Sequence, residues 1–556
     1  MSCRQESELQ AILDKEQGYI IHRGGGRSKF ALVYPNLYKV GMSNLGMHII
    51  YDMLNARTDT SCERVFLPES KSLAQIERSK KPLLSLETQM PLFKFPLIGF
   101  AVSFEPDYFN LLKILELGKV KLLSSERGDL DPIVIAGGPC ATFNPEPLSM
   151  FVDAFVIGEG EVILPSLLDT IYAAKAEGLS RSELLNNLSE VAGVYVPSVP
   201  KLTKRQWLKN LDNHPAHTVI VTDDTEFNMY LIETARGCGR HCRFCMAGYC
   251  FRRPRNRSLE VLKGEVESAK KFGKKIGLMG AAISDYPWIN ELCKIIQSEG
   301  LPMSVASFRA DSVTAELVEA LVSSGLKTLT IAPEAGSIKM RAVINKGIEE
   351  EHIFQAIELG LTAGVRNFRL YFMIGLPFET LEDVEAIVKL SNQIKDYMDT
   401  HSGNRLTLSV NPFIPKPFTP FQWAPMADKQ YLEEALKLLR CGLKRKNVEI
   451  IAESPRESFI QAILARGDRH LGEVLLNAHC NGGIKAFRKA MKELKIDAED
   501  CLYRQRDKDE ILPWDHLDMG FSKDYLYNEY EKAARLEKTS PCFKDCKRCG
   551  VCKEYN

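Results

Sequence analysis

The 556-residue sequence predicts an α/β protein with two successive series of strands and helices and a mainly helical end. Between about residues 28 and 196, short apolar runs alternate with stretches of helical periodicity, a pattern typical of a parallel sheet with helices on its faces. Six further strand–helix pairs follow between about residues 228 and 423, and this repetition favours a barrel or partial barrel. Beyond about residue 424 the chain becomes mainly helical and charged.

The strands of the first series are expected in "KFALVYP", "PLIGFAVSF", "DPIVIAGG" and "DAFVIGEGE". Helical stretches such as "GMHIIYDMLN" and "DYFNLLKILELGK" lie between them. Ligands of parallel sheets bind at the carboxyl ends of the strands, where the glycine-rich turns of these runs fall.

The strands of the second series are expected in "MYLIETARG", "KKIGLMGAA", "MSVASFRAD", "TLTIAPEAG", "NFRLYFMIGLP" and "RLTLSVNPFIP". Reactive residues of such barrels lie at the carboxyl ends of strands. A group of cysteines follows the first run, Glu334 lies in the fourth and Gly375 in the fifth, so we expect the functional site at this edge.

Composition narrows the class of protein. Hydrophobic residues make up 45% and charged residues 26%, and Lys+Arg and Asp+Glu both number 72. This balance argues against broad electrostatic capture of nucleic acid or anionic membrane. The N-terminus lacks the apolar core of a signal peptide, and no run approaches the roughly 20 apolar residues that span a bilayer. We therefore expect a cytoplasmic protein without a membrane partner.

Three cysteines, Cys238, Cys242 and Cys245, are crowded into "CGRHCRFC"; we call them the loop cysteines. Three thiolates do not complete a structural zinc site, which normally has four protein ligands. A [4Fe–4S] cluster held by three cysteines leaves one iron open to another ligand. Phe244 is placed to shield such a cluster from water. A zinc site completed by His241 or Cys250 is the alternative.

Four more cysteines close the chain, with spacings of three, two and two residues. They suit either zinc or a second [4Fe–4S] cluster. These tail cysteines are Cys542, Cys546, Cys549 and Cys552. A separate basic segment, "FRRPRNRS" from Phe251, is interpreted as a local part of the site, with phosphate or RNA contact and a solvated loop as alternatives.

The loop cysteines and the motifs that follow them resemble the radical S-adenosylmethionine (radical SAM) superfamily, whose hallmark is Cys-x3-Cys-x2-Cys after the first barrel strand. The resemblance implies a [4Fe–4S] cluster whose open iron binds S-adenosylmethionine, and reductive cleavage of that molecule to methionine and a 5′-deoxyadenosyl radical. "LMGAAISDYP", "APEAGS", "MRAVINK" and "MIGLPFET" stand in the expected order, although the usual Gly-Gly-Glu is absent. The implied contacts to S-adenosylmethionine are Phe244, Gly280, Ala281, Glu334, Arg341 and Gly375.

The first series resembles the cobalamin-binding domain that precedes the barrel in one radical SAM class, through "YPNLYKVGMSNLG", "GGPCATFNPEP" and "DAFVIGEGE". The implied cobalamin contacts are Gly41, Ser43, Asn44, Gly137, Gly138 and Glu159. His48 lacks the Asp-x-His-x-x-Gly context of a cobalt ligand and is interpreted as a helix residue. The whole chain also resembles an uncharacterised bacterial radical SAM group.

The predicted organisation is a Rossmann-like domain of the cobalamin-binding type at residues 1–205, a (β/α)6 partial TIM barrel at 206–425, and a mainly helical region at 426–556. The resemblance implies an enzyme that forms the 5′-deoxyadenosyl radical and then methylates or otherwise modifies an unactivated carbon, with an external electron donor of the flavodoxin or ferredoxin type. The substrate is a small molecule, RNA or protein, and the sequence assigns no catalytic residue. The alternatives are a tRNA-modifying enzyme, for example a methylthiolating one, and a non-catalytic iron–sulfur redox sensor.

Overall fold

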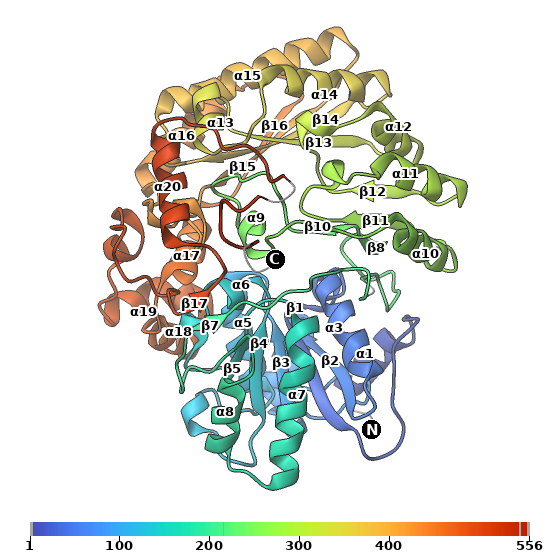
Figure 1. Cartoon of the computed structure of the whole chain (residues 1–556), viewed down its shortest axis with the longest axis vertical. Helices are drawn as coiled ribbons and strands as arrows, with labels where there is room; N and C mark the ends of the chain where they lie inside the picture. Colours follow the sequence, from blue (N-terminus) through green and yellow to red (C-terminus); the bar gives the residue numbers. More distant parts are fainter. Residues whose placement is uncertain (1–3, 215, 544–545, 553–556) are drawn as a thin grey trace. The chain divides into compact units, whose positions relative to one another are not determined.

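A computed structural model describes residues 4–214, 216–543 and 546–552. The chain forms two compact units (Figure 1). The first contains the described residues up to 229 together with 464–497 and 511–519. The second contains 230–463, 498–510 and the described residues from 520 onward. Residues 426–556, predicted as one region, therefore contribute to both units.

The first unit is built around a six-stranded sheet of order β2-β1-β3-β4-β5-β6. The first five strands run parallel, and β6 is antiparallel to β5. Strand order reverses between β1 and β3, which makes this a doubly wound sheet with a topological switch point. The strands are β1 (Ser28–Leu37), β2 (Thr60–Leu67), β3 (Leu97–Ala101), β4 (Ile133–Gly137), β5 (Ala154–Val156) and β6 (Val194–Tyr195).

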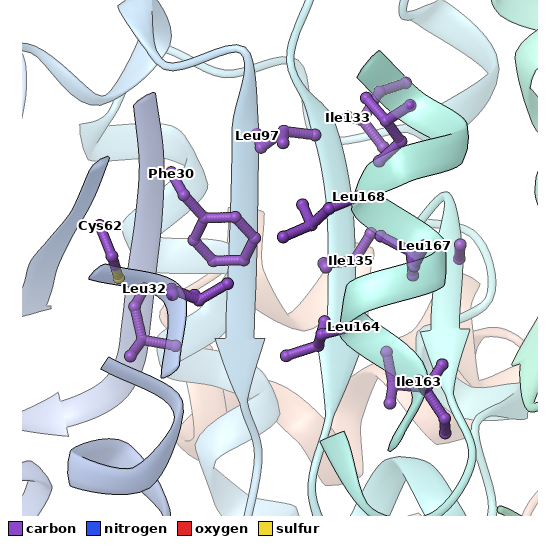
Figure 2. Packing of buried hydrophobic residues seen from close by; sticks show 14 of the residues in the cluster. Phe30, Leu32, Cys62, Leu97, Ile133, Ile135, Ile163, Leu164, Leu167 and Leu168 are labelled. Carbon is purple, nitrogen blue, oxygen red and sulfur yellow. The ribbon is translucent and has the colours of Figure 1, made fainter. Parts of the chain in front are cut away.

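The core of the first unit lies between this sheet and the helices α3, α7 and α8. Figure 2 shows side chains of α7 pointing at residues of β1, β3 and β4, with Leu164 and Leu168 facing Phe30 and Ile135. Apolar positions three and four apart, such as Leu164, Leu167 and Leu168, form one face of α7, and that face is buried. These helices are α3 (Leu45–Ala56), α7 (Gly160–Glu177) and α8 (Arg181–Ser189).

Helices from the end of the chain complete the first unit. α18 packs on α5, and the Phe109 and Phe487 rings meet edge to face at 5.6 Å. Asn144 donates to the carbonyl of Gly467 at 2.7 Å. The remaining elements of this unit are α1 (Arg4–Leu13), α2 (Tyr38–Gly41), α4 (Ser70–Ser79), α5 (Tyr108–Leu117), α6 (Pro139–Phe143), β7 (Thr203–Lys204), α18 (Leu471–Cys480), α19 (Phe487–Glu493) and β17 (Leu517–Asp518).

The second unit contains the six predicted strands in the predicted order. They form a sheet of order β12-β11-β8 and a sheet of order β13-β14-β15-β16, linked by a parallel bridge between Phe308 and Ile331. β16 was not predicted. The strands are β8 (Met229–Glu233), β11 (Lys275–Met279), β12 (Met303–Val305), β13 (Thr328–Glu334), β14 (Asn367–Ile374), β15 (Leu406–Pro412) and β16 (Val448–Ala452).

Helices alternate with these strands along the chain, as β–α repetition predicts (Figure 1). β14 buries every second residue, so one of its faces forms core while the other stays half-buried. None of the described helices is both long and apolar enough to cross a membrane. The helices of this unit are α10 (Leu259–Lys270), α11 (Ile289–Ser298), α12 (Ala315–Ser323), α13 (Ile338–Val343), α14 (Glu350–Thr362), α15 (Leu381–Thr400), α16 (Lys429–Gly442), α17 (Pro455–Arg466), which runs on into the first unit, and α20 (Lys523–Ala534).

Candidate functional site

The loop cysteines lie in a closed loop that follows β8, the first strand of the second unit. β9 (Ala235–Arg236) and β10 (Arg255–Asn256) pair antiparallel and join the two ends of this loop. A short helix, α9 (Met246–Cys250), lies inside it. Gly237 has φ 82°, and a Cβ there would clash with the carbonyl oxygen of Phe251. The tight closure therefore requires glycine at this position.

The loop thiols are largely withdrawn from solvent. Cys242 is buried, and Cys238 and Cys245 are half-buried. Burial raises the pKa of Cys245 to about 12, with the Cys242 thiol adding to the shift, and burial also raises the pKa of Cys238. In the metal-free loop these two thiols are protonated at neutral pH, and a bound metal displaces their protons.

Two arginines support the loop. Arg309 donates through Nη2 to the carbonyl of Lys346 at 2.7 Å, and its Nη1 lies 3.8 Å from Cys242 Sγ. Arg240, within the loop, forms an ion pair with Asp285 at 2.6 Å. These contacts fix the loop to the neighbouring strand ends.

Several predicted contacts for S-adenosylmethionine lie beside this loop. Glu334 ends β13 with φ 68°, and its carboxylate pairs with Lys346 Nζ at 3.0 Å. The same ammonium group lies 6.0 Å from the ring centre of Phe244. Gly280 and Ala281 are exposed after β11, the strand next to β8 in the sheet. The structure thus brings Phe244 and Glu334 together around a lysine and puts the glycine step at a neighbouring strand end.

The other two predicted contacts face different cavities. Arg341 is buried and lines a small cavity beside α13. Gly375 lines a cavity of about 700 Å³ together with Glu379 and Tyr431. The Glu379 carboxylate accepts from Gly375 N at 2.6 Å and from the Tyr431 hydroxyl at 3.0 Å, and burial raises its pKa to about 7. Neither Arg341 nor Gly375 lines the cavity that contains Cys238.

The C-terminal tail is fixed to the cysteine loop. Cys542 N donates to the carbonyl of Gly239 at 2.7 Å, and the Cys542 Cβ stands 3.1 Å from where a Cβ on Gly239 would be. Arg243, fully buried, donates to the carbonyl of Glu537 at 2.6 Å and pairs with buried Glu529 of α20 at 3.3 Å. The sequence carried no signal for these contacts, because each one joins residues roughly 300 positions apart.

His241 makes a further contact between the loop and the tail. Its Nδ1 accepts from Arg252 Nη1 at 3.0 Å and from the Tyr525 hydroxyl at 2.8 Å. Because arginine cannot accept a hydrogen bond, the imidazole proton is on Nε2, which donates to Cys542 Sγ at 3.2 Å. Burial, and next the charge of Arg252, lowers the pKa of His241 to about 2.

One cavity of about 930 Å³ in the second unit brings one loop cysteine, Cys238, together with the tail cysteines. Cys238, all four tail cysteines, Arg253 and Asp285 line it. Within residues 4–214, 216–543 and 546–552, no three His, Cys, Asp or Glu side chains already stand in positions that would hold a metal ion. The donor set nevertheless suits iron–sulfur ligation, because every cysteine in both sets is a free thiol.

The basic segment is largely turned into the protein. Arg252 is buried, with its guanidinium 5.0 Å from the ring centre of Tyr249. Arg257 is buried and pairs with Glu233 at 2.8 Å. Arg255 is also buried. These arginines stabilise the loop, in line with the interpretation of the segment as a local part of the site.

In the first unit, residues that follow β1 and β3 meet at the switch point of the sheet. Ser43 and Asn44 follow β1, and Asn44 Nδ2 donates to Ser103 Oγ, after β3, at 3.4 Å. Gly138 follows β4 with φ 98°, and a Cβ there would lie 2.7 Å from the carbonyl oxygen of Val102. Backbone and small polar groups therefore occupy the place where open α/β sheets bind ligands.

The other residues predicted to contact cobalamin, Gly41, Gly137 and Glu159, are packed or hydrogen-bonded within the first unit. Gly41 packs against the ring of Phe66, and Gly137 ends β4. Glu159 is buried, and its carboxylate accepts from Leu208 N at 2.8 Å. These contacts hold the sheet and the connecting chain in place.

His48 is fully engaged inside the first unit. Its Nε2 lies 3.0 Å from the carbonyl oxygen of Met42, and its Nδ1 accepts from Val219 N at 3.3 Å. Burial lowers its pKa to about 4. Both ring nitrogens are occupied, so this histidine is not free to bind cobalt.

Comparisons with known proteins agree with this geometry. A family model for radical SAM proteins, N-terminal, matches residues 46–197, and the model of the radical SAM superfamily matches residues 232–391. An uncharacterised protein of Methanocaldococcus jannaschii is 32% identical over 453 residues, which is 80% of this chain and 90% of that protein. An uncharacterised methyltransferase of Pyrococcus horikoshii is 28% identical over 47% of this chain and 58% of its own length. A threonylcarbamoyladenosine tRNA methylthiotransferase of Aquifex aeolicus is 22% identical over 44% of this chain and 60% of its own length.

Among solved structures, the radical S-adenosylmethionine methyltransferase TsrM from Kitasatospora setae, with cobalamin and a [4Fe–4S] cluster bound, has a TM-score of 0.50 and 13% identity. The match covers 92% of this chain and 99% of TsrM, and it shows a shared fold. The chain belongs to the radical SAM superfamily and is a radical SAM enzyme. Its cofactors are accordingly a [4Fe–4S] cluster and S-adenosylmethionine, and the three free thiols of the loop suit such a cluster.

Proposed function

We propose that this enzyme methylates an unactivated carbon of its substrate and uses cobalamin together with S-adenosylmethionine. The observation that carries the proposal is the presence of two sites in one chain. The second unit holds the loop cysteines, and the first has a doubly wound sheet with polar strand ends at its switch point. That switch point is where such sheets bind large flat cofactors.

In the second unit the loop cysteines would hold the cluster, which supplies the electron for cleavage of S-adenosylmethionine. The residues around the loop would bind and orient S-adenosylmethionine. Glu334 offers a carboxylate to the amino group of the cofactor, and Lys346 keeps that carboxylate in place at 3.0 Å. Phe244 covers the loop against water beside Cys245. Arg341 and Gly375 would not contact S-adenosylmethionine directly. They would position the ends of the strands next to them, β13 and β14.

In the first unit, Asn44 and Ser103 offer hydrogen bonds at the switch point. Ser43 would support them through the turn, because its hydroxyl donates to the carbonyl of Lys39 at 2.7 Å. Gly137 and Gly138 allow close approach to the backbone. Cobalamin would be held there without an imidazole from His48, because both nitrogens of that ring already have partners.

A second candidate is sulfur insertion into tRNA. The tail cysteines favour it, because they line the same cavity as Cys238 and a second thiolate-bound centre is a plausible sulfur site. The inward-facing arginines of the basic segment weigh against it, since RNA binding relies on exposed cations.

The test is anaerobic reconstitution of the full chain with iron, sulfide and hydroxocobalamin, followed by gel filtration. We expect about one cobalamin per chain, and 5′-deoxyadenosine after addition of S-adenosylmethionine and dithionite or a flavodoxin-type donor. Cys242→Ser should abolish 5′-deoxyadenosine formation but retain cobalamin.

Ser103→Phe should lose cobalamin but still form 5′-deoxyadenosine, because a phenyl ring fills the switch point. The matched control is Ser182→Phe on α8, whose neighbour Arg181 contacts Asp129 at the opposite end of the sheet. Absence of cobalamin from the wild-type protein would refute the methylation mechanism, and absence of 5′-deoxyadenosine would refute the role of the loop cysteines.

A further inference from the structure

The tail cysteines share a cavity with one of the loop cysteines. They line the cavity of about 930 Å³ that Cys238 lines, and Cys546 and Cys549 are buried. Two hydrogen bonds hold the tail against the loop: Cys542 N donates to the carbonyl of Gly239, and the Arg243 guanidinium donates to the carbonyl of Glu537. A tail that only ended the chain would not need buried thiols in this position.

Hydrogen-bond donors point at the tail sulfurs. His241 Nε2 lies 3.2 Å from Cys542 Sγ, and Arg548 Nε lies 3.3 Å from Cys546 Sγ. N–H groups and cations beside thiolate sulfur stabilise added negative charge, so they raise the reduction potential of an iron–sulfur cluster. Zinc has no redox change for such donors to tune.

The spacing of the tail cysteines also favours iron. Four thiolates separated by three, two and two residues form a single short run, and iron–sulfur proteins take most of the ligands of a cluster from such runs. Structural zinc sites usually combine two ligand pairs separated by a longer segment.

We propose that the tail cysteines hold a second, redox-active [4Fe–4S] centre in the wall of the cavity that Cys238 lines, and that His241 connects it to the loop cysteines. His241 is covalently next to Cys242 and hydrogen-bonded to Cys542. It therefore provides a short path for an electron between the two thiolate sets.

The role of this path rests on the function proposed above. One electron leaves the reduced tail centre, which is oxidised by one unit, and reduces the cluster on the loop cysteines by one unit. An external one-electron donor of the flavodoxin or ferredoxin class then reduces the tail centre again. No proton or bond is exchanged in this step.

The first experiment identifies the metal in the full chain, prepared anaerobically. We expect about eight irons and little zinc in the wild type, and about four irons in both the loop variant C238A/C242A/C245A and the tail variant C546A/C549A. The dithionite-reduced loop variant should keep the EPR signal of a [4Fe–4S] cluster. Stoichiometric zinc in the wild type, or full iron in the tail variant, would overturn the proposal.

These variants distinguish a failure of the proposed function from a failure of the proposed tail centre. A wild-type protein that contains both centres but forms no 5′-deoxyadenosine contradicts the proposed function and leaves the tail centre in place. If the loop variant does not fold, the iron content of the tail variant decides by itself.

The second experiment tests the connection through the midpoint potential of the tail centre. His241→Leu removes the N–H donor, so the potential should fall and 5′-deoxyadenosine should form about tenfold more slowly. His241→Gln keeps an N–H donor and should stay near the wild type. Arg548→Leu should lower the potential without altering the loop, whereas Lys538→Leu, an exposed cation paired with Glu349, should not. Equal potentials for His241→Leu and the wild type would disprove the connection.

Discussion

Replacement of Arg243 by methionine should loosen the tail from the cysteine loop. The guanidinium is fully buried, pairs with Glu529 at 3.3 Å and donates to the carbonyl of Glu537 and to carbonyls at the end of α13. Removal of one partner from a buried charge pair costs about 3–5 kcal/mol. In the variant, the buried Glu529 carboxylate (0% exposed) keeps its other ion pair, with Lys532 Nζ at 2.9 Å. We therefore expect the lower end of that range, about 3 kcal/mol.

The assay is calorimetric unfolding of the anaerobic full chain, with proteolysis of the tail as a second readout. A loss of about 3 kcal/mol lowers the unfolding temperature of a unit of this size by about 5 °C. The matched control is Arg535→Met, which removes a 52% exposed arginine paired with the Glu537 carboxylate at 2.7 Å. Such surface pairs contribute little to stability, so this control should unfold close to the wild-type temperature. Equal shifts in the two variants would refute the reasoning, since burial of the pair would then not matter.

Three further predictions concern single residues. Glu334→Gln should weaken binding of S-adenosylmethionine about tenfold, measured by equilibrium dialysis; unchanged binding would exclude this carboxylate as a contact. Glu379 has a pKa raised by burial to about 7, above its unfolded value, so its contribution to stability is complete below pH about 4.5 and is lost as the pH rises through 7. Glu379→Gln should abolish that part of the pH dependence in unfolding experiments, and a persisting slope would assign it to another group. His48→Leu should cost about 1–3 kcal/mol of stability, because it leaves backbone groups without partners, yet retain cobalamin; loss of cobalamin from a folded variant would make His48 a ligand.

The order of elements was predictable because strand and helix periodicity is a local property of the sequence. The six strands of the second unit occur in the predicted order. β16 was missed because the apolar run "VEIIA" is short and lies between charged segments, and its residues are only half-buried or exposed. The strand order of the first sheet, with its switch point, cannot be read from such periodicity.

Helices from the region 426–556 also escaped prediction as parts of the first unit. Their amphipathic pattern indicates that one face is buried but not which surface covers it. α18 and α19 complete the first unit, whereas α20 belongs to the second.

The sequence by itself placed three thiols in one short loop, because their spacing is a local property, and this spacing suits a [4Fe–4S] cluster with one open iron. Only the tertiary structure brought Cys542 to His241, 301 residues away, and put the tail cysteines in one cavity with Cys238. It also turned the arginines of the basic segment inward, where carboxylates, carbonyls and aromatic rings stabilise them. Spacing and charge are local properties of the sequence. Contacts between residues distant in sequence depend on which buried surfaces pack together.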